Sequence, residues 1–281
     1  KVLVYKQDGT LMWSKVIALK WSISSPLICQ FDQDLELEII SVLTNGDIYS
    51  LDHTGRMAFF ASCSATTFSS PALGDVNDNG EPDIWIGTKN GIYAWDNDGT
   101  PISPFIGWPD SNYHDFSSIV IGDIAEADTG YEIAAVDRYP FRAYIINKDG
   151  DCVQGWPTHL SLYDLLASPS LANLDGDNNL ELIISSEPDV FAFTSDASVL
   201  DGFPVDRLAN ICSNPVVVDI DNDQDFEIIV GSGGEDSRFY GYHHNGEQIL
   251  GFPIPIGQGA TSTPFVGDID GDDKLEMIVS C

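Results

Sequence analysis

A short acidic segment recurs along the chain at a nearly constant interval. Its clearest copy, residues 268–276, places oxygen-bearing side chains at positions 1, 3, 5 and 9 of a nine-residue loop and apolar residues at positions 2 and 8. Three other segments repeat the pattern in full. The four full copies contain Asp75, Asn77, Asn79 and Asp83 (loop 2), Asn173, Asp175, Asp177 and Glu181 (loop 4), Asp219, Asp221, Asp223 and Glu227 (loop 5), and Asp268, Asp270, Asp272 and Glu276 (loop 6).

Two further segments are weaker copies. Loop 1 has Gln30, Asp32, Asp34 and Glu38, and loop 3 keeps Asp123 and Glu132 but has Ala125 and Ala127 between them and one extra residue. From the first residue of each loop to the next, the intervals are 45, 48, 50, 46 and 49 residues. A period of this size indicates repeated supersecondary units.

A β-hairpin pattern follows each of the first five loops. In one copy the apolar run Ile92 to Trp95 is followed by an Asp96–Gly99 turn and a second run, and the same pattern stands once more at the N-terminus with no acidic loop before it. Such patterns predict hairpins. Each unit therefore has four strands: one before the loop, one after it, and the two of the hairpin. We expect the fourth strand to end at a Gly-aromatic-Pro segment, because proline has no N–H to donate, and the aromatic side chain to lie between neighbouring sheets. In the second unit the first three strands are expected at Pro71 to Val76, Asp83 to Gly87 and Gly91 to Trp95. No stretch shows a sustained helical period.

Four short antiparallel strands repeated about six times are typical of a β-propeller, in which radial closure removes long exposed edges. We expect an all-β fold with one domain over residues 1–281, built as a six-bladed β-propeller of four-stranded antiparallel blades. One blade would combine both chain termini, and a ring of seven or eight blades is the alternative if the chain is a fragment. The expected blades are 24–63, 69–108, 117–156, 167–203, 213–252, and 262–281 plus 1–20.

The acids of one loop repel one another unless a cation lies between them. Ca²⁺ takes six to eight oxygen ligands, which alternate residues of a tight loop can supply. A polar hairpin turn without metal is the other interpretation, because Asp, Asn and Gly are ordinary turn residues. The repetition of the pattern favours the cation.

The charge of the chain narrows the classes of partner. Its 44 acids and 12 bases give a net charge of −32, which disfavours nucleic acid, anionic lipid and membrane insertion and favours cations, basic partners or neutral glycans. An acid-rich, salt-adapted surface is the alternative reason for this charge. The five cysteines form no CxxC pair. The chain begins at Lys1 rather than Met, so we expect a removed leader or a piece of a larger secreted protein.

Segments that precede the loops carry a family resemblance. Ser70 to Asp75, Ser118 to Asp123 and Thr263 to Asp268, each followed by its acidic loop, resemble the FG-GAP/VCBS repeats of integrin α-subunit propellers and bacterial secreted proteins. This resemblance implies Ca²⁺ binding by side chains at positions 1, 3, 5 and 9 and a carbonyl at position 7. It assigns about four sites to the sixteen residues of loops 2, 4, 5 and 6, with Asp32, Asp34 and Glu38 as a weaker set and no metal in loop 3. Position 6 departs from the family pattern, because only loop 2 has glycine there (Gly80).

The resemblance also implies a scaffold for recognition. We expect a secreted or cell-surface module, of bacterial origin, that binds a glycan or a protein. No catalytic motif is present, and a polysaccharide lyase is the alternative. The candidate ligand-binding residues are Tyr113, Arg138, Tyr139 and Arg142, which combine aromatic and basic side chains.

Overall fold

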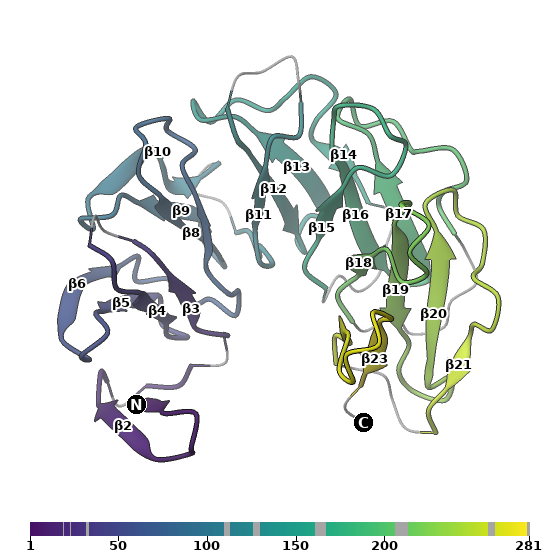
Figure 1. Cartoon of the computed structure of the whole chain (residues 1–281). Helices are drawn as coiled ribbons and strands as arrows, with labels where there is room; N and C mark the ends of the chain where they lie inside the picture. Colours follow the sequence, from purple (N-terminus) through teal and green to yellow (C-terminus); the bar gives the residue numbers. More distant parts are fainter. Residues whose placement is uncertain are drawn as a thin grey trace. The chain divides into compact units, whose positions relative to one another are not determined.

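The chain is all-β in the part that the structure describes. The computed structural model describes residues 1–18, 20–22, 24–31, 34–109, 113–125, 130–160, 167–205, 213–257 and 262–279, and within these ranges it contains strands and no helix. The chain divides into two compact units, Lys1–Ile121 with Lys148–Gly150, and Gly122–Asn147 with Asp151–Cys281. Figure 1 labels most of the strands used below.

The first unit contains one two-stranded and two four-stranded antiparallel sheets. The N-terminal hairpin pairs β1 (Val2–Tyr5) with β2 (Leu11–Lys15). The next sheet has the order β3 (Leu27–Cys29), β4 (Glu38–Val42), β5 (Asp47–Leu51) and β6 (Met57–Ser62). The third has the order β7 (Ala72–Gly74), β8 (Asp83–Thr88), β9 (Gly91–Trp95) and β10 (Pro101–Trp108).

Four further sheets follow along the chain. One comprises β11 (Val120–Gly122), β12 (Glu132–Asp137), β13 (Arg142–Ile146) and β14 (Thr158–His159), and the boundary between the units falls within β11. The next has three strands, β15 (Ser170–Ala172), β16 (Glu181–Ser186) and β17 (Asp189–Phe193). The last two comprise β18 (Val216–Val218), β19 (Glu227–Gly231), β20 (Arg238–His243) and β21 (Ile254–Pro255), and the pair β22 (Phe265–Gly267) and β23 (Glu276–Ile278).

The second strand of each complete sheet forms the core. In β8, β12, β16 and β19 every residue is buried, and these strands are rich in Ile, Val and Ala rather than alternating in polarity, as is typical of strands buried on both faces. In the first unit, Ile40 and Ile48 pack with Ile84 and Ile86 of the following sheet. In the second unit, Ile183 and Ala192 pack with Ile228 and Val230 in the same way.

Three tryptophan side chains donate hydrogen bonds to a turn of the sheet that follows along the chain. The indole Nε1 of Trp13 donates to the carbonyl of His53 at 2.8 Å, that of Trp108 to Gly150 at 2.9 Å, and that of Trp156 to Ser195 at 2.8 Å. Each acceptor lies in the turn that follows the third strand of the next sheet. Trp108 and Trp156, which stand in Gly-aromatic-Pro segments, thus each contact the sheet that follows.

The fourth strands differ from the sequence-based expectation. The second of the four-stranded sheets in the first unit has its fourth strand, β10, before Pro109, as expected. In two other sheets the paired residues come after the Gly-aromatic-Pro segment, in β14 and β21. Between β17 and the segment that follows it, only the single bridges Phe193↔Val199 and Val190↔Val205 form. Proline lacks an N–H donor, so pairing resumes only beyond it.

No helix among the described residues is long and apolar enough to cross a membrane.

Candidate metal-binding loops

The last acid of each loop is held by the backbone of the same loop. One carboxylate oxygen, Oε2, accepts the N–H of the second loop residue in loops 1, 3, 4, 5 and 6. The donor–acceptor distances are 2.8 Å for Phe31 and Glu38, 2.7 Å for Ile124 and Glu132, 2.6 Å for Leu174 and Glu181, 3.0 Å for Ile220 and Glu227, and 2.9 Å for Ile269 and Glu276. This hydrogen bond leaves the other oxygen, Oε1, for other partners.

The acids at positions 1 and 5 shape the loop in a repeated way. The Asp219 carboxylate accepts the N–H groups of Asp223 at 3.1 Å and Gln224 at 3.0 Å, and the Asp223 carboxylate accepts that of Asp225 at 3.0 Å. The equivalent bonds occur in loops 2 and 6. Such side-chain-to-backbone bonds are typical of Asp and Asn in turns.

Left-handed backbone is needed at two loop positions. At position 6, Gly80, Gln224 and Asp273 have φ of 87°, 80° and 66°, so residues other than glycine adopt this conformation in loops 5 and 6. Position 4 also has positive φ, which the sequence analysis did not anticipate; the residues there are Asp78, Gly176, Asn222 and Gly271. All four residues at position 4 are Gly, Asn or Asp, the residue types that tolerate left-handed backbone best.

Among the described residues, two buried carboxylate oxygens have no hydrogen-bond partner. They are Oδ2 of Asp83 in loop 2, a residue with 0% exposure, and Oε1 of Glu38 in loop 1, with 1% exposure. Burial, together with the nearby charges of Asp96 and Asp75, raises the pKa of Asp83 to about 7. A buried carboxylate oxygen without a partner is costly, and a hard cation would satisfy it. The donor chemistry of the loop therefore fits Ca²⁺.

Carboxylates of loops 4, 5 and 6 come together in groups of three. Ligand atoms of the three members of each group lie within 4.8 Å of one another; the groups are Asp175, Asp177 and Glu181, Asp219, Asp221 and Asp223, and Asp268, Asp270 and Glu276. Burial and the charges of Asp175 and Asp177 raise the pKa of Glu181 to about 7. In loop 6, Asp272 accepts from Lys274 Nζ at 3.1 Å. In loop 2 the Asn77 amide donates to Asp83 at 3.0 Å.

In loop 3 a single acid accepts two backbone donors. Glu132 Oε2 accepts the N–H groups of Ile124 at 2.7 Å and Ala125 at 3.1 Å. Asp32 of loop 1 and Ala127 of loop 3 lie outside the described residues.

In loops 1 to 5, a residue that the sequence analysis did not include in the site faces the last acid of the loop. This residue stands where the third strand meets the turn that follows it, and the strand register places it beside the last acid. In order along the chain, these residues are Asp52, Asp96, Asn147, Thr194 and His243. His243 Nδ1 lies 3.1 Å from Glu227 Oε1, and Asp96 Oδ2 accepts from Asn79 at 3.4 Å. Its recurrence at the start of each hairpin turn was the signal that could have found it.

The candidate ligand-binding residues lie at the other end of their strands. Tyr139 in the turn between β12 and β13 is 56% exposed, and Arg138 and Arg142 are half-buried. Asp137 is fully buried and its Oδ1 accepts the N–H of Tyr139 at 3.0 Å. Tyr113, 54% exposed, belongs to the first unit, whereas the other three belong to the second. A surface shared by all four stays a prediction.

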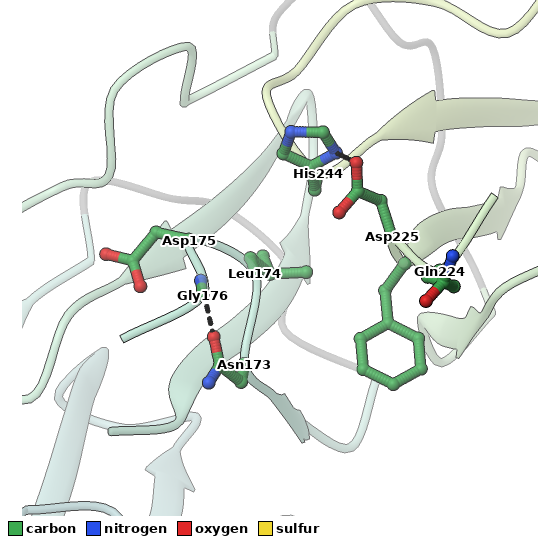
Figure 2. Close-up of a pocket in the computed structure, with 8 residues that line it drawn as sticks. Asn173, Leu174, Asp175, Gly176, Gln224, Asp225 and His244 are labelled. Atoms are coloured by element: carbon green, nitrogen blue, oxygen red, sulfur yellow. Dashed lines mark hydrogen bonds and ion pairs between the residues drawn. The ribbon is translucent and has the colours of Figure 1, made fainter. Parts of the chain in front are cut away.

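A pocket of about 310 Å³ lies between loops 4 and 5 (Figure 2). Its polar lining includes an ion pair of 3.5 Å between His244 Nδ1 and Asp225 Oδ2 and a hydrogen bond of 2.7 Å from the Gly176 N–H to Asn173 Oδ1. Phe226, 39% exposed, adds an aromatic ring to the lining. The complete lining is Asn173, Leu174, Asp175, Gly176, Gln224, Asp225, Phe226 and His244.

Known structures with a similar fold are β-propeller-type proteins. Bap1, a biofilm matrix protein of V. cholerae, is 16% identical with a TM-score of 0.60, over 87% of this chain and 43% of its own. BBS1N, solved in complex with ARL6DN, is 11% identical with a TM-score of 0.66, over 92% of this chain and 78% of its own. BamB from Moraxella catarrhalis is 17% identical with a TM-score of 0.60, over 96% of this chain and 70% of its own.

At these identities the structural likeness shows the fold alone. The chain spans less than half the length of the Bap1 structure. No curated protein matches it in sequence. The model of the FG-GAP-like repeat family matches residues 211–279, which include loops 5 and 6. The resemblance inferred from the sequence is therefore confirmed: residues 211–279 match the FG-GAP-like repeat model, and the fold is similar to that of β-propeller-type proteins.

Proposed function

We propose that this chain is a calcium-stabilised β-propeller that acts as an extracellular binding module. The observation that carries the calcium proposal is Asp83, a fully buried carboxylate whose Oδ2 has no hydrogen-bond partner. Ca²⁺ would be held by the side-chain oxygens of loops 2, 4, 5 and 6, about four sites, with Asp34 and Glu38 of loop 1 as a weaker set. When bound, Ca²⁺ supplies positive charge that holds the like-charged acids together.

Each ion would contribute a modest amount of stability. At about 1 mM Ca²⁺ and a Kd of about 0.1 mM, one site adds about 1.4 kcal/mol and four add about 5 to 6 kcal/mol. This sum is comparable to the net stability of a whole domain. Calorimetric titration of metal-free protein with Ca²⁺ tests the proposal. About four ions per chain are expected, and a chain that takes up none would contradict it.

We further propose that the two terminal pairs of strands form one blade and close a six-bladed ring. The N-terminal hairpin supports this, because Trp13 bonds to the turn of the next sheet in the same way as Trp108 and Trp156, which end complete hairpins. The hairpin β1–β2 would thus be the outer half of a blade, and β22–β23, with loop 6, would be the inner half.

Hydrogen exchange tests this closure. In a composite blade the backbone N–H groups of β23 that do not pair with β22 are protected by β1, and deletion of residues 1–18 removes the protection. Equal hydrogen exchange of β23 in the full chain and in the deletion variant would contradict the proposal that β1 pairs with β23.

As a module, the propeller would bind a glycan or a protein. The turn Asp137–Arg142 supports this, because it presents an exposed tyrosine between two arginines, a combination that recurs in binding hot spots. Among the similar structures, BBS1N is in complex with ARL6DN and Bap1 is a biofilm matrix protein, which supports a recognition role outside catalysis.

A glycan array tests the ligand class. Glycan binding that is lost in Tyr139→Ala and kept in Phe226→Ala would place the glycan at the turn Asp137–Arg142. The reverse result would place it in the pocket between loops 4 and 5. An array without any binding favours a protein ligand, which cross-linking on the surface of the source cells would then identify.

A further inference from the structure

Loop 5 differs from the other acidic loops because an imidazole approaches its ligands. His243 comes from the end of β20, and its ring lies with Asp221 and Glu227 in a group whose ligand atoms are all within 4.8 Å of one another. In the sheets that contain loops 1 to 4, the corresponding positions carry oxygen-bearing side chains, namely Asp52, Asp96, Asn147 and Thr194. This cluster therefore combines a nitrogen donor with acids.

The two inner members of the cluster are already placed as ligands of one ion would be. Glu227 has a fully buried side chain, and its Oε2 is fixed by the Ile220 N–H at 3.0 Å, so Oε1 points to His243 Nδ1 at 3.1 Å. Ligand atoms at about 2.0 to 2.2 Å from a tetrahedral Zn²⁺ stand about 3.3 to 3.6 Å apart, and slightly closer in octahedral geometry. Asp221 is exposed, and its torsions can bring an oxygen to the third position.

The chemistry of this donor set differs from that of a calcium loop. Ca²⁺ takes oxygen ligands, whereas imidazole suits Zn²⁺ and other first-row transition dications. We propose that Asp221, Glu227 and His243 form a site for a transition dication of the Zn²⁺ class. Asp221 also belongs to the all-oxygen group with Asp219 and Asp223, so Ca²⁺ and Zn²⁺ compete for loop 5.

This inference extends the proposed calcium function at one loop and is tested separately from it. Zn²⁺ is titrated calorimetrically into the metal-free full chain, and Co²⁺ is used as an absorption probe for nitrogen ligation. We expect one Zn²⁺ per chain that binds at least about tenfold more weakly in His243→Asn, since even changes outside the ligand shell cost about that much. Ca²⁺ binding to loops 2, 4 and 6 stays the same in this variant.

Two matched variants complete the test. His244→Asn removes the neighbouring imidazole, which pairs with Asp225, and leaves the affinity for Zn²⁺ unchanged. Thr194→His places an imidazole beside Glu181, at the position that His243 occupies beside Glu227, and adds a second Zn²⁺ per chain. Equal Zn²⁺ affinity in wild type and His243→Asn, or no added ion in Thr194→His, overturns the proposal. A wild-type chain that binds Zn²⁺ but takes up no Ca²⁺ would instead contradict the calcium function.

Discussion

Loops 2 and 3 follow one another in the sequence and end in equally buried acids, but the two carboxylates have different partners. Asp83 leaves Oδ2 without a hydrogen bond, whereas Glu132 Oε2 accepts two backbone N–H groups. Loop 3 also has Ala125 and Ala127 where loop 2 has Asn77 and Asn79. The comparison teaches that a buried carboxylate can be satisfied by its own loop or left to an ion, and that the neighbouring residues decide between the two.

Removal of Ca²⁺ is expected to have the largest effect on this comparison. Chelation with EDTA should lower the free energy of unfolding by about 5 to 6 kcal/mol, and the Tm by about 10 to 20 °C for a chain of this size. Differential scanning calorimetry with and without EDTA measures this, and readdition of Ca²⁺ is the control. An unchanged Tm would mean that loops 2, 4, 5 and 6, like loop 3, need no bound ion for stability.

Substitution of Asp83 isolates one site. Asp83→Asn should lower stability by about 1.4 kcal/mol at about 1 mM Ca²⁺, because one ion is lost. In EDTA it should cost nothing or stabilise the protein, since a buried charge is removed. Urea unfolding in the two conditions measures the difference. A cost that is the same with and without Ca²⁺ would speak against an ion in loop 2.

The pH should change calcium affinity through the same acids. The pKa values of Asp83 and Glu181 are raised to about 7 in the metal-free fold, above those of an unfolded chain. Their contribution to stability is therefore present at low pH and lost as the pH rises through about 7. The metal-free protein should melt at a higher temperature at pH 6 than at pH 8.

Ca²⁺ must displace these protons. Its affinity for loops 2 and 4 should therefore rise about tenfold from pH 6 to pH 8, as the ionised fraction of a group with a pKa of about 7 increases. Calorimetry in buffers of different ionisation heat measures the released protons. No proton release between pH 6 and pH 7 would show that other groups hold the ions.

Substitution of Glu132 is expected to have the smallest effect. Glu132→Gln keeps a carbonyl acceptor for Ile124 and Ala125 but loses the charge, so it should cost about 1 kcal/mol or less. The cost should be equal in Ca²⁺ and in EDTA, in contrast to Asp83→Asn. A cost seen only in the presence of Ca²⁺ would mean that loop 3 also takes up an ion.

Local patterns predicted the strands well. The run after loop 2 was expected at Asp83 to Gly87 and is observed as β8, Asp83–Thr88, and the next strand was expected and observed at Gly91–Trp95. The signal for these strands is local, because apolar runs bounded by turn residues predict them without reference to the rest of the chain. The fourth strands were less predictable, because their pairing depends on where the chain returns after the Gly-aromatic-Pro segment.

The sequence by itself determined the repeat, the all-β class and the spacing of acids within each loop, because these depend on residues close together in the chain. Only the tertiary structure decided which carboxylate oxygens have partners, and that an imidazole from β20 lies beside Glu227. Those contacts join atoms from different strands, and their distances follow from strand register and burial rather than from any local pattern.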